Sequence, residues 1–353
     1  MILFLLAFSG SLDQRITLAG YYDLVLASAS AGGRDSGAWC GSRVDDVPEG
    51  AFLLGAFLFW TSGFWTSSPG HMTSTRLAIS FADTSDVSPQ QVFNANGNWV
   101  MFADVTTEIT GGINGTYWCQ KLDAAKGFSW CLVLIYTASG IPKRTLDLHY
   151  GCLDLGFGGD TTSWRDTFRL GVSASPSWGK VGFFSVGGDA MWEGDQAIFR
   201  GHRLSNWMNP WNNIGNGSYS DPFTGEWAWM NWPWGPADAD VFEVAGLFPS
   251  GVSLVPYSLV PGDDWIYYAF AFLLADETGS AGMDENDGVA TLIPGRIFRV
   301  ASPEGGWLKI YFVDGRLALE SRLSPGTHRI ALPLSSGAYL YTFGPLRGSF
   351  VLR

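Results

Sequence analysis

Histidines and serine motifs are the first places to look for chemistry in this chain. The four histidines are His71, His149, His202 and His328, and no two of them have a metal-binding spacing such as H-E-x-x-H. Residues 33–37 contain Gly, Asp and Ser but not the full Gly-Asp-Ser-Gly run of a protease nucleophile loop. No phosphate-binding glycine motif occurs either. We therefore expect a protein that is not an enzyme.

Tryptophan is the residue type that most suggests binding. The chain has 17 tryptophans, and six of them fall within residues 207–234. Their indole faces could hold sugar rings, with nearby amides and a carboxylate for the hydroxyl groups. They could instead pack beneath a long loop or in a subunit interface, where tryptophan is enriched, and this second interpretation is favoured. The six are Trp207, Trp211, Trp227, Trp229, Trp232 and Trp234, and the polar neighbours are Asn209, Asn212, Asn213 and Asp221.

Acidic residues of the same region give a third hypothesis, a glycoside hydrolase. Hydrolysis of a glycosidic bond needs two carboxyl groups about 5–10 Å apart. The candidates are Glu193, Asp195, Glu226 and Glu243. Scattered acids are also what an acidic surface shows, so this hypothesis ranks below glycan binding.

One acidic stretch has part of the pattern of a calcium loop. Asp284, Asn286 and Asp287 precede Gly288, and alternating oxygen ligands before a sharply turning glycine are what such a loop needs. The run is one residue short of Asp-x-Asn-x-Asp-Gly and has no glutamate at the twelfth position. A solvated linker is the favoured interpretation. We expect no cofactor, with Ca²⁺ at these residues as the alternative.

The cysteines number four, which allows two disulfides in an exported chain. Cys119 and Cys131 lie on two candidate strands separated by a polar turn, which predicts that they pair. Cys40 and Cys152 then pair by elimination. The alternative is four free, buried thiols. No C-x-x-C spacing of a zinc site appears.

Composition restricts the class of protein further. The net charge is −12 and the basic residues are scattered, which argues against nucleic acid as a partner. Only 15% of residues are charged, whereas 45 are glycine and 15% are aromatic, a balance typical of β-proteins. Low charge also removes the groups that keep strand edges and apolar patches from self-association.

Short apolar runs punctuated by Gly, Pro, Asn and Asp predict the elements that position these residues. The run 130–136 is apolar on both faces, as in a central strand. The fold class expected is all-β, with a large β-sandwich or jelly-roll-like domain and a small C-terminal β-sandwich. The expected ranges are 1–9 for a signal peptide or N-terminal strand, 10–275 for the large domain, 276–288 for an acidic Gly-rich linker and 289–353 for the small domain. The sequence contains no run of eighteen apolar residues, so no membrane span is predicted. The other strands are expected within 18–26, 51–60, 76–81, 99–105, 116–122, 145–150, 167–172, 180–186, 196–200, 252–259 and 265–274.

The last sixty residues resemble a known family. Strands are expected within 308–313, 316–319, 329–332, 337–342 and 348–353. Asp314-Gly315-Arg316, Leu323 to Ile330, Ser336-Gly337-Ala338-Tyr339 and the terminal Phe350-Val351-Leu352-Arg353 resemble the C-terminal sorting domain of the type IX (Por) bacterial secretion system. This resemblance implies export and an extracellular or cell-surface location.

Residues 54–274 resemble an uncharacterised β-sandwich module of secreted prokaryotic surface proteins. The matching motifs keep the order of that family, and the resemblance implies a role in surface architecture or adhesion without a known catalytic residue. We therefore expect a secreted structural or adhesive protein that could self-assemble into a filament, with itself, cell-surface components or glycans as partners. The motifs are Ala56 to Trp60, Ala103 to Thr106, Asn114 to Tyr117, Trp130 to Tyr136, Arg144 to Gly151, Gly194-Asp195 and Leu204 to Asn213.

Overall fold

Strands and tight turns make up the described part of this computed structural model, which confirms the expected all-β class. The short 3-10 helix η2 (Ala245–Leu247) is the helical element among these residues. No described helix has the length and apolar character needed to cross a membrane. The described residues are 10–31, 37–62, 74–79, 83–110, 112–120, 122, 128–155, 163–170, 178–187, 193–221, 226–229, 237–248, 253–263, 265–277, 289–293, 297–302, 305–312, 317–332, 337–343 and 346–352.

Two central sheets lie face to face in the larger part of the molecule. Their neighbouring strands are antiparallel except for one parallel pair in the seven-stranded sheet. The seven-stranded sheet has the order β1 (Ser11–Tyr21), β11 (Lys143–Asp154), β20 (Tyr267–Asp276), β13 (Gly179–Val186), β18 (Ala237–Glu243), β16 (Ser218–Asp221) and β17 (Glu226–Trp229). The five-stranded sheet has the order β2 (Asp23–Ala31), β10 (Phe128–Thr137), β4 (Phe52–Ser62), β8 (Asn98–Asp104) and β7 (Gln91–Ala95).

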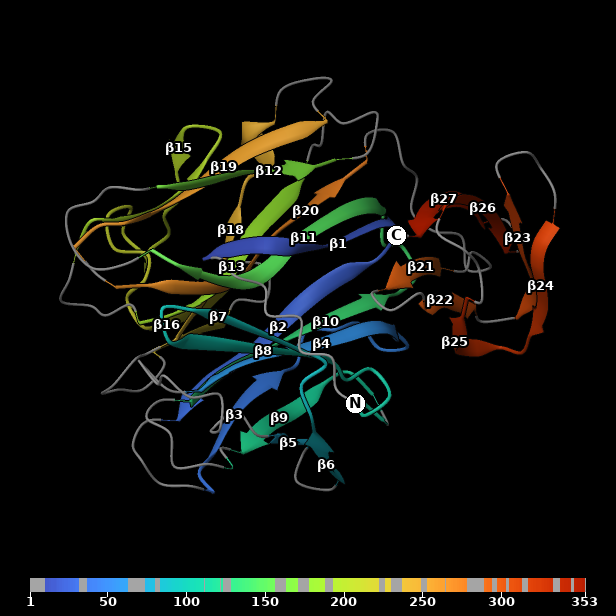
Figure 1. Cartoon of the computed structure of the whole chain (residues 1–353), viewed down its shortest axis with the longest axis horizontal. Helices are drawn as coiled ribbons and strands as arrows, with labels where there is room; N and C mark the ends of the chain where they lie inside the picture. Colours follow the sequence, from blue (N-terminus) through green and yellow to red (C-terminus); the bar gives the residue numbers. More distant parts are fainter. Residues whose placement is uncertain are drawn as a thin grey trace.

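An outer sheet covers each central sheet, so the large part has four layers (Figure 1). Three hydrophobic cores fill the spaces between successive layers. The β12 sheet covers the seven-stranded sheet and has the order β12 (Trp164–Arg169), β19 (Leu254–Pro261), β14 (Asp195–Phe199) and β15 (His202–Arg203). The β3 sheet covers the five-stranded sheet and has the order β3 (Trp39–Val44), β9 (Gly115–Gln120), β5 (Thr75–Ile79) and β6 (Asp83–Val87).

The central strands are apolar on both faces because each face meets a different core. Along β10, Cys131 and Val133 point into the core between the two central sheets, whereas Leu132 and Leu134 point into the core beneath the β3 sheet. Successive side chains of a strand point to opposite faces, so a strand covered on both sides must be apolar throughout. The unbroken apolar run 130–136 therefore predicts a central strand correctly.

The order of the strands along the chain explains how four layers form. Strands β2 to β10 build the five-stranded and β3 sheets, and strands β11 to β20 build the seven-stranded and β12 sheets. Each half is thus a two-layer sandwich, and the halves stack through their inner sheets. Strand β1 belongs to the first half in sequence but pairs with β11, from Ser11 opposite Cys152 to Tyr21 opposite Lys143. It therefore ties the two sandwiches together.

The C-terminal strands pair with one another in two further sheets at one end of the molecule (Figure 1). All five strands expected between residues 308 and 353 are present, with bounds shifted by a few residues. The first sheet has the order β21 (Val289–Ile293), β22 (Ile297–Ser302) and β25 (Gly326–Ala331). The second has the order β24 (Leu317–Leu323), β23 (Gly306–Phe312), β26 (Gly337–Phe343) and β27 (Leu346–Leu352).

Candidate functional site

Two exposed tryptophans of the described chain lie on the loop between β15 and β16. The Trp207 side chain is 70% exposed and Trp211 is 46% exposed, and the guanidinium of Arg203 lies 4.3 Å from the Trp211 ring centre. We call residues 204–217 the tryptophan loop. Of the six clustered tryptophans, Trp227 and Trp229 fall on β17 with side chains outside the described part, and 232 and 234 lie outside it altogether. The structure therefore shows two of the predicted indoles at the surface.

Internal hydrogen bonds give the tryptophan loop a defined shape. The Asn206 side-chain oxygen accepts bonds from the backbone N–H groups of Met208 (2.9 Å) and Asn209 (2.8 Å). The Asn206 N–H in turn donates to the Asn209 carbonyl at 2.9 Å, and the Asn213 N–H donates to the Pro210 carbonyl at 3.0 Å. Asparagine favours such turns because its short side chain bonds to nearby backbone. These turns hold Trp207 and Trp211 away from the core.

Buried acids hold the tryptophan loop from beneath. Asp195, Asp238 and Asp240 are fully buried. Asp240 accepts a bond from the Asn209 side-chain amide at 2.9 Å, and Asp195 accepts one from the Gly215 N–H at 2.5 Å. Burial, together with the charge of Asp240, raises the pKa of Asp238 well above its usual value. Asp195, one of the carboxylates expected for a hydrolase, thus binds the backbone of the tryptophan loop.

The other predicted hydrolase acids lie in different settings. Glu193 accepts a hydrogen bond from the Asn212 side-chain amide at 2.9 Å, at the protein surface. Glu243 is exposed at the end of β18, and the side chain of Glu226 lies outside the described part. Among the described members of the set, Asp195 is therefore fully buried, whereas Glu193 and Glu243 lie at the surface.

A buried polar cluster that sequence reasoning missed surrounds His149 on β11. The His149 ring is fully buried, with Nε2 lying 3.1 Å from Asp147 Oδ2 and Nδ1 lying 2.9 Å from Asp166 Oδ2. The Tyr257 hydroxyl is 3.0 Å from the same Nδ1. Arg15 on β1 lies 3.6 Å from Asp147 and 3.5 Å from Asp166. The cluster therefore joins strands of the seven-stranded and β12 sheets.

The electrostatics of this cluster favour a charged imidazole. Burial lowers the pKa of His149, but hydrogen bonds to Asp147 and Asp166 outweigh it and the net shift is upward. Burial raises the pKa of Asp166, but bonds from His149 and from the Thr167 N–H outweigh it and the net shift is downward. Both ring nitrogens are thus occupied by fixed partners, as in a structural ion pair.

A second buried ion network lies where β2, β11, β13 and β20 meet. Arg144 lies 2.7 Å from Asp23 and 2.9 Å from Asp276, and Lys180 lies 2.8 Å from Asp23. The Arg144 guanidinium also lies 3.9 Å from the centre of the Trp178 ring. These ion pairs and the cation–π contact thus connect strands of the two sandwiches.

The cysteines are free and buried, and both predicted pairings are wrong. Cys40 and Cys119 face the core beneath the β3 sheet, whereas Cys131 and Cys152 face the core between the central sheets. The Cys119–Cys131 pairing failed because β9 and β10 enter different sheets and do not form a hairpin, and the pairing of Cys40 with Cys152 by elimination failed with it. The strand register instead places Cys40 opposite Cys119. Burial raises the pKa of all four thiols, to about 12 for Cys40, so none is marked as a nucleophile.

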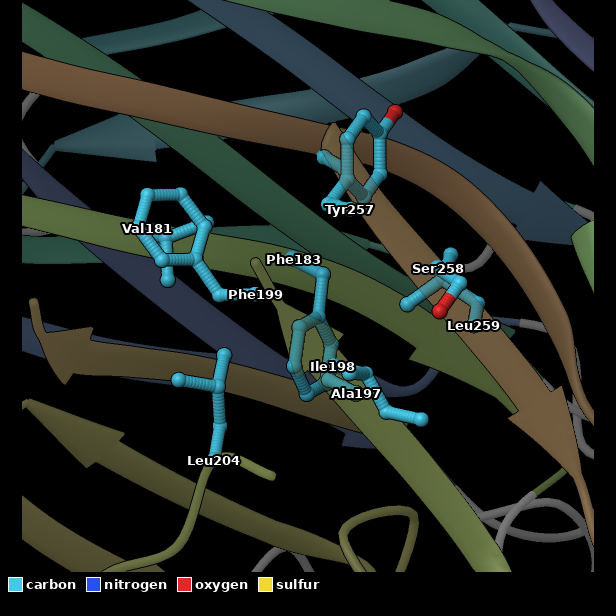
Figure 2. A pocket seen from close by; sticks show the side chains of 11 residues that line it. Val181, Phe183, Ala197, Ile198, Phe199, Leu204, Tyr257, Ser258 and Leu259 are labelled. Atoms are coloured by element: carbon cyan, nitrogen blue, oxygen red, sulfur yellow. The ribbon is translucent and has the colours of Figure 1, made fainter. Parts of the chain in front are cut away.

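Figure 2 shows a cavity between the seven-stranded and β12 sheets. Its volume is about 10 Å³, close to the minimum for one water molecule. Pockets for small molecules usually have volumes of about 300–1,000 Å³. The cavity is a packing gap, lined by Val181, Phe183, Ala197, Phe199, Leu204 and Tyr257 among others.

Other predicted sites fall outside the described residues. These are the calcium-loop residues 284–287, His71, residues 33–36 of the serine motif and the N-terminal segment 1–9. Among the residues that the structure does describe, no group of three or more His, Cys, Asp or Glu side chains is arranged to hold a metal ion. His202 is exposed on β15, and the His328 ring bonds to the Ser324 carbonyl at 2.8 Å.

Comparisons with known proteins show no family for this chain. No family model and no curated protein matches it. Solved structures that match include the major capsid protein P2 of bacteriophage PM2, with 11% identity over 76% of this chain and 100% of that chain, at a TM-score of 0.22. AerE from Microcystis aeruginosa matches with 6% identity over 72% of this chain and 88% of that chain, at 0.25. A β-glucuronidase from Ruminococcus gnavus matches with 6% identity over 61% of this chain and 35% of that chain, at 0.18. TM-scores this low carry no argument about function.

Proposed function

We propose that this chain is a structural subunit that associates with further copies of itself, head to tail, outside the cell. The observation that carries the proposal is the placement of exposed apolar side chains at both ends of the molecule. Trp207 and Trp211 lie on the loop that joins β15 to β16, whereas Trp307 (52% exposed) and Leu317 (49%) lie on β23 and β24. Figure 1 shows β15 and β16 on the left side of the molecule and β23 and β24 at its right end.

Two different patches at opposite ends favour an open polymer. When one patch of a subunit meets a different patch of the next, the contact is heterologous and produces rings or filaments. Burial of an exposed apolar side chain in an interface stabilises the complex by about 25 cal/mol for each Å² removed from water. Tryptophan is also enriched at protein interfaces, where its amphipathic ring buries a large area. A second copy is therefore a suitable occupant for each patch.

The composition supports the same proposal. Charged residues make up only 15% of the chain, so few charged side chains are present to protect strand edges and apolar patches from self-association. Most of the buried ionisable groups described above pair with each other or with backbone, in the manner of a structural protein. The resemblance of the last sixty residues to a sorting domain supports an extracellular location.

Self-association is tested by sedimentation of the full chain over a range of concentrations. We expect the wild type to form oligomers, and the double variant Trp207→Ser/Trp211→Ser to remain monomeric. Because the contact is heterologous, Trp307→Ser should have the same effect although it lies at the other end. Phe52→Ser is the matched control, since Phe52 is 45% exposed on β4 and belongs to neither patch. A wild type that stays monomeric at high concentration contradicts the proposal.

Glycan binding is the second candidate, and the tryptophan loop is the reason to keep it. Trp207 and Trp211 are exposed on a loop of fixed shape, as a platform for sugar rings requires. Polysaccharide pull-down separates the two candidates, because glycan binding should be lost in Trp207→Ser/Trp211→Ser but retained in Trp307→Ser. If both Trp207→Ser/Trp211→Ser and Trp307→Ser lose self-association and the wild type binds no glycan, the result favours the structural subunit.

A further inference from the structure

Buried oxygen atoms without hydrogen-bond partners gather beneath the tryptophan loop. Among the described residues, Asp238 Oδ2, Ser185 Oγ, Asn213 Oδ1 and Asn216 Oδ1 have no hydrogen-bond partner. Asp238 and Ser185 are fully buried, and the two asparagines are each 5% exposed. Nearly all buried polar groups in proteins are satisfied, so a cluster of exceptions indicates a missing ion or water.

The strand register and the hydrogen bonds of the tryptophan loop place Ser185 and Asn216 next to Asp238. Ser185 on β13 lies directly opposite Asp238 on β18, so the two side chains are neighbours on one face of the sheet. Asp238 Oδ1 accepts bonds from the Gly217 N–H (2.7 Å) and the Ser218 N–H (3.1 Å), which places Asn216 beside it. The unpartnered oxygens thus come from two strands of one sheet and from the tryptophan loop above them.

The charge of this region is strongly negative. Asp240 lies two residues beyond Asp238 on the same strand, hence on the same face. The interactions that shift the Asp238 carboxyl are burial, the charges of Asp240 and Asp195, and two backbone N–H groups, with no cationic side chain among them. Two close carboxylates in a buried site require either a proton or a cation between them.

We propose that Asp238 and Asp240, with the oxygens of Ser185 and Asn216, bind a Ca²⁺ ion beneath the tryptophan loop. Ca²⁺ takes about six to eight oxygen ligands and accepts carboxylates and amide carbonyls in flexible geometry. The site combines two carboxylates with neutral hydroxyl and amide oxygens, a ligand set that Ca²⁺ accepts. It contains no nitrogen or sulfur ligand of the kind that zinc prefers.

The ion would also fix the shape of the tryptophan loop. Asn209 donates from its amide to Asp240 at 2.9 Å and accepts a bond from the Ser218 hydroxyl at 2.8 Å. The Asn216 amide donates to the Met208 carbonyl at 2.8 Å. An ion held by Asp238 and Asp240 therefore acts on the segment that carries Trp207. Binding of the ion does not depend on the proposed self-association.

Calorimetric titration of the EDTA-treated full chain with CaCl₂ at neutral pH tests this site. We expect saturable binding of about one Ca²⁺ per chain and a rise in melting temperature on addition of CaCl₂. Asp238→Asn should weaken binding at least about tenfold, because it removes one of two charged ligands. The control Asp86→Asn, on the far β3 sheet, should bind as the wild type does.

Two outcomes would overturn the proposal. If the wild type shows neither heat of binding nor a rise in melting temperature, a proton or water satisfies Asp238 instead. If Asp238→Asn binds as tightly as the wild type, the ion lies elsewhere. If Asp238→Asn fails to fold, Ser185→Ala is tested in its place. We expect Ser185→Ala to bind Ca²⁺ more weakly than the wild type, and unchanged binding would contradict the proposed site. Ca²⁺ binding should persist in Trp207→Ser/Trp211→Ser. The calcium titration therefore tests the site even if the protein does not self-associate.

Discussion

His149 is the buried group whose charge has the clearest consequence for stability. Its ring lies between Asp147 and Asp166, and Arg15 balances the two carboxylates from β1. The Arg169 N–H also donates to Asp147 at 2.6 Å, and the Thr17 hydroxyl donates to the same carboxylate at 3.0 Å. Asp147 thus has fixed partners from β1, β11 and β12. A pKa raised by such partners stabilises the fold while the ring is protonated.

The pH dependence of unfolding should reveal this charge. Because the folded-state pKa of His149 is raised, its contribution is complete below the unfolded value of about 6.5 and is lost as the pH rises through the folded value. We expect the melting temperature to fall over that range in the wild type, and this component of the fall to disappear in His149→Gln. Differential scanning calorimetry between pH 5 and 8 measures it.

The control for this experiment is His202→Gln, since His202 is exposed on β15. It should keep the pH dependence of the wild type. Equal slopes for wild type and His149→Gln would show that the ring is neutral in the folded protein.

Strands are held together across the layers by side chains that cross from one sheet to the next. Arg144 is the clearest case, because it leaves β11 and reaches Asp23 at the start of β2 and Asp276 at the end of β20. The first half of the chain is thereby attached to the second half at the same place where β1 turns into β2. The tyrosine before β2 adds to this junction, since the Tyr22 hydroxyl donates to the Leu18 carbonyl and accepts a bond from the Leu146 N–H.

Arg144→Ala should destabilise the protein by about 3–5 kcal/mol, since it leaves two mostly buried carboxylates with fewer positive partners. Chemical denaturation monitored by tryptophan fluorescence measures the loss. Arg76→Ala is the matched control, because Arg76 pairs with Asp86 in an exposed ion pair on the β3 sheet. The control should change the unfolding midpoint far less. Similar shifts in both variants would mean that the Arg144 network adds nothing beyond a surface pair.

At the scale of the whole molecule, the described residues form a four-layer stack and a smaller pair of sheets, and the two share no described strand. The stack has three hydrophobic cores of its own, built entirely from residues before 277. Among the described side chains of the C-terminal part, Leu308, Ile310 and Leu332 are buried. The stack by itself therefore has the hydrophobic interior that an independent folding unit needs.

A chain truncated after Glu277 should fold without the C-terminal sheets. We expect circular dichroism typical of β-structure and one cooperative thermal transition, because the three cores of the stack remain complete. Self-association should be lost in the truncated chain, since Trp307 and Leu317 are removed. An aggregated product without a cooperative transition would show that the C-terminal sheets are required for the stack.

Local patterns in the sequence account for the secondary structure. The apolar run 130–136 predicts the central strand β10, and the turn residues between short runs predict an all-β fold. These features follow from interactions between near neighbours, so a single sequence carries them. The two exposed tryptophans were also among the predicted contacts, because their clustering is visible along the chain.

The tertiary structure alone decided which distant residues meet. Cys40 faces Cys119 across 79 positions, and the Tyr257 hydroxyl reaches His149 across 108. Such contacts depend on which strand enters which sheet and in what register, and one shift by a single residue would turn every side chain to the opposite face. The amino-acid sequence by itself determined that the chain forms strands with buried faces. The stacking of the four sheets determined which faces pack against each other, because both faces of the central sheets are buried only when all four layers are in place.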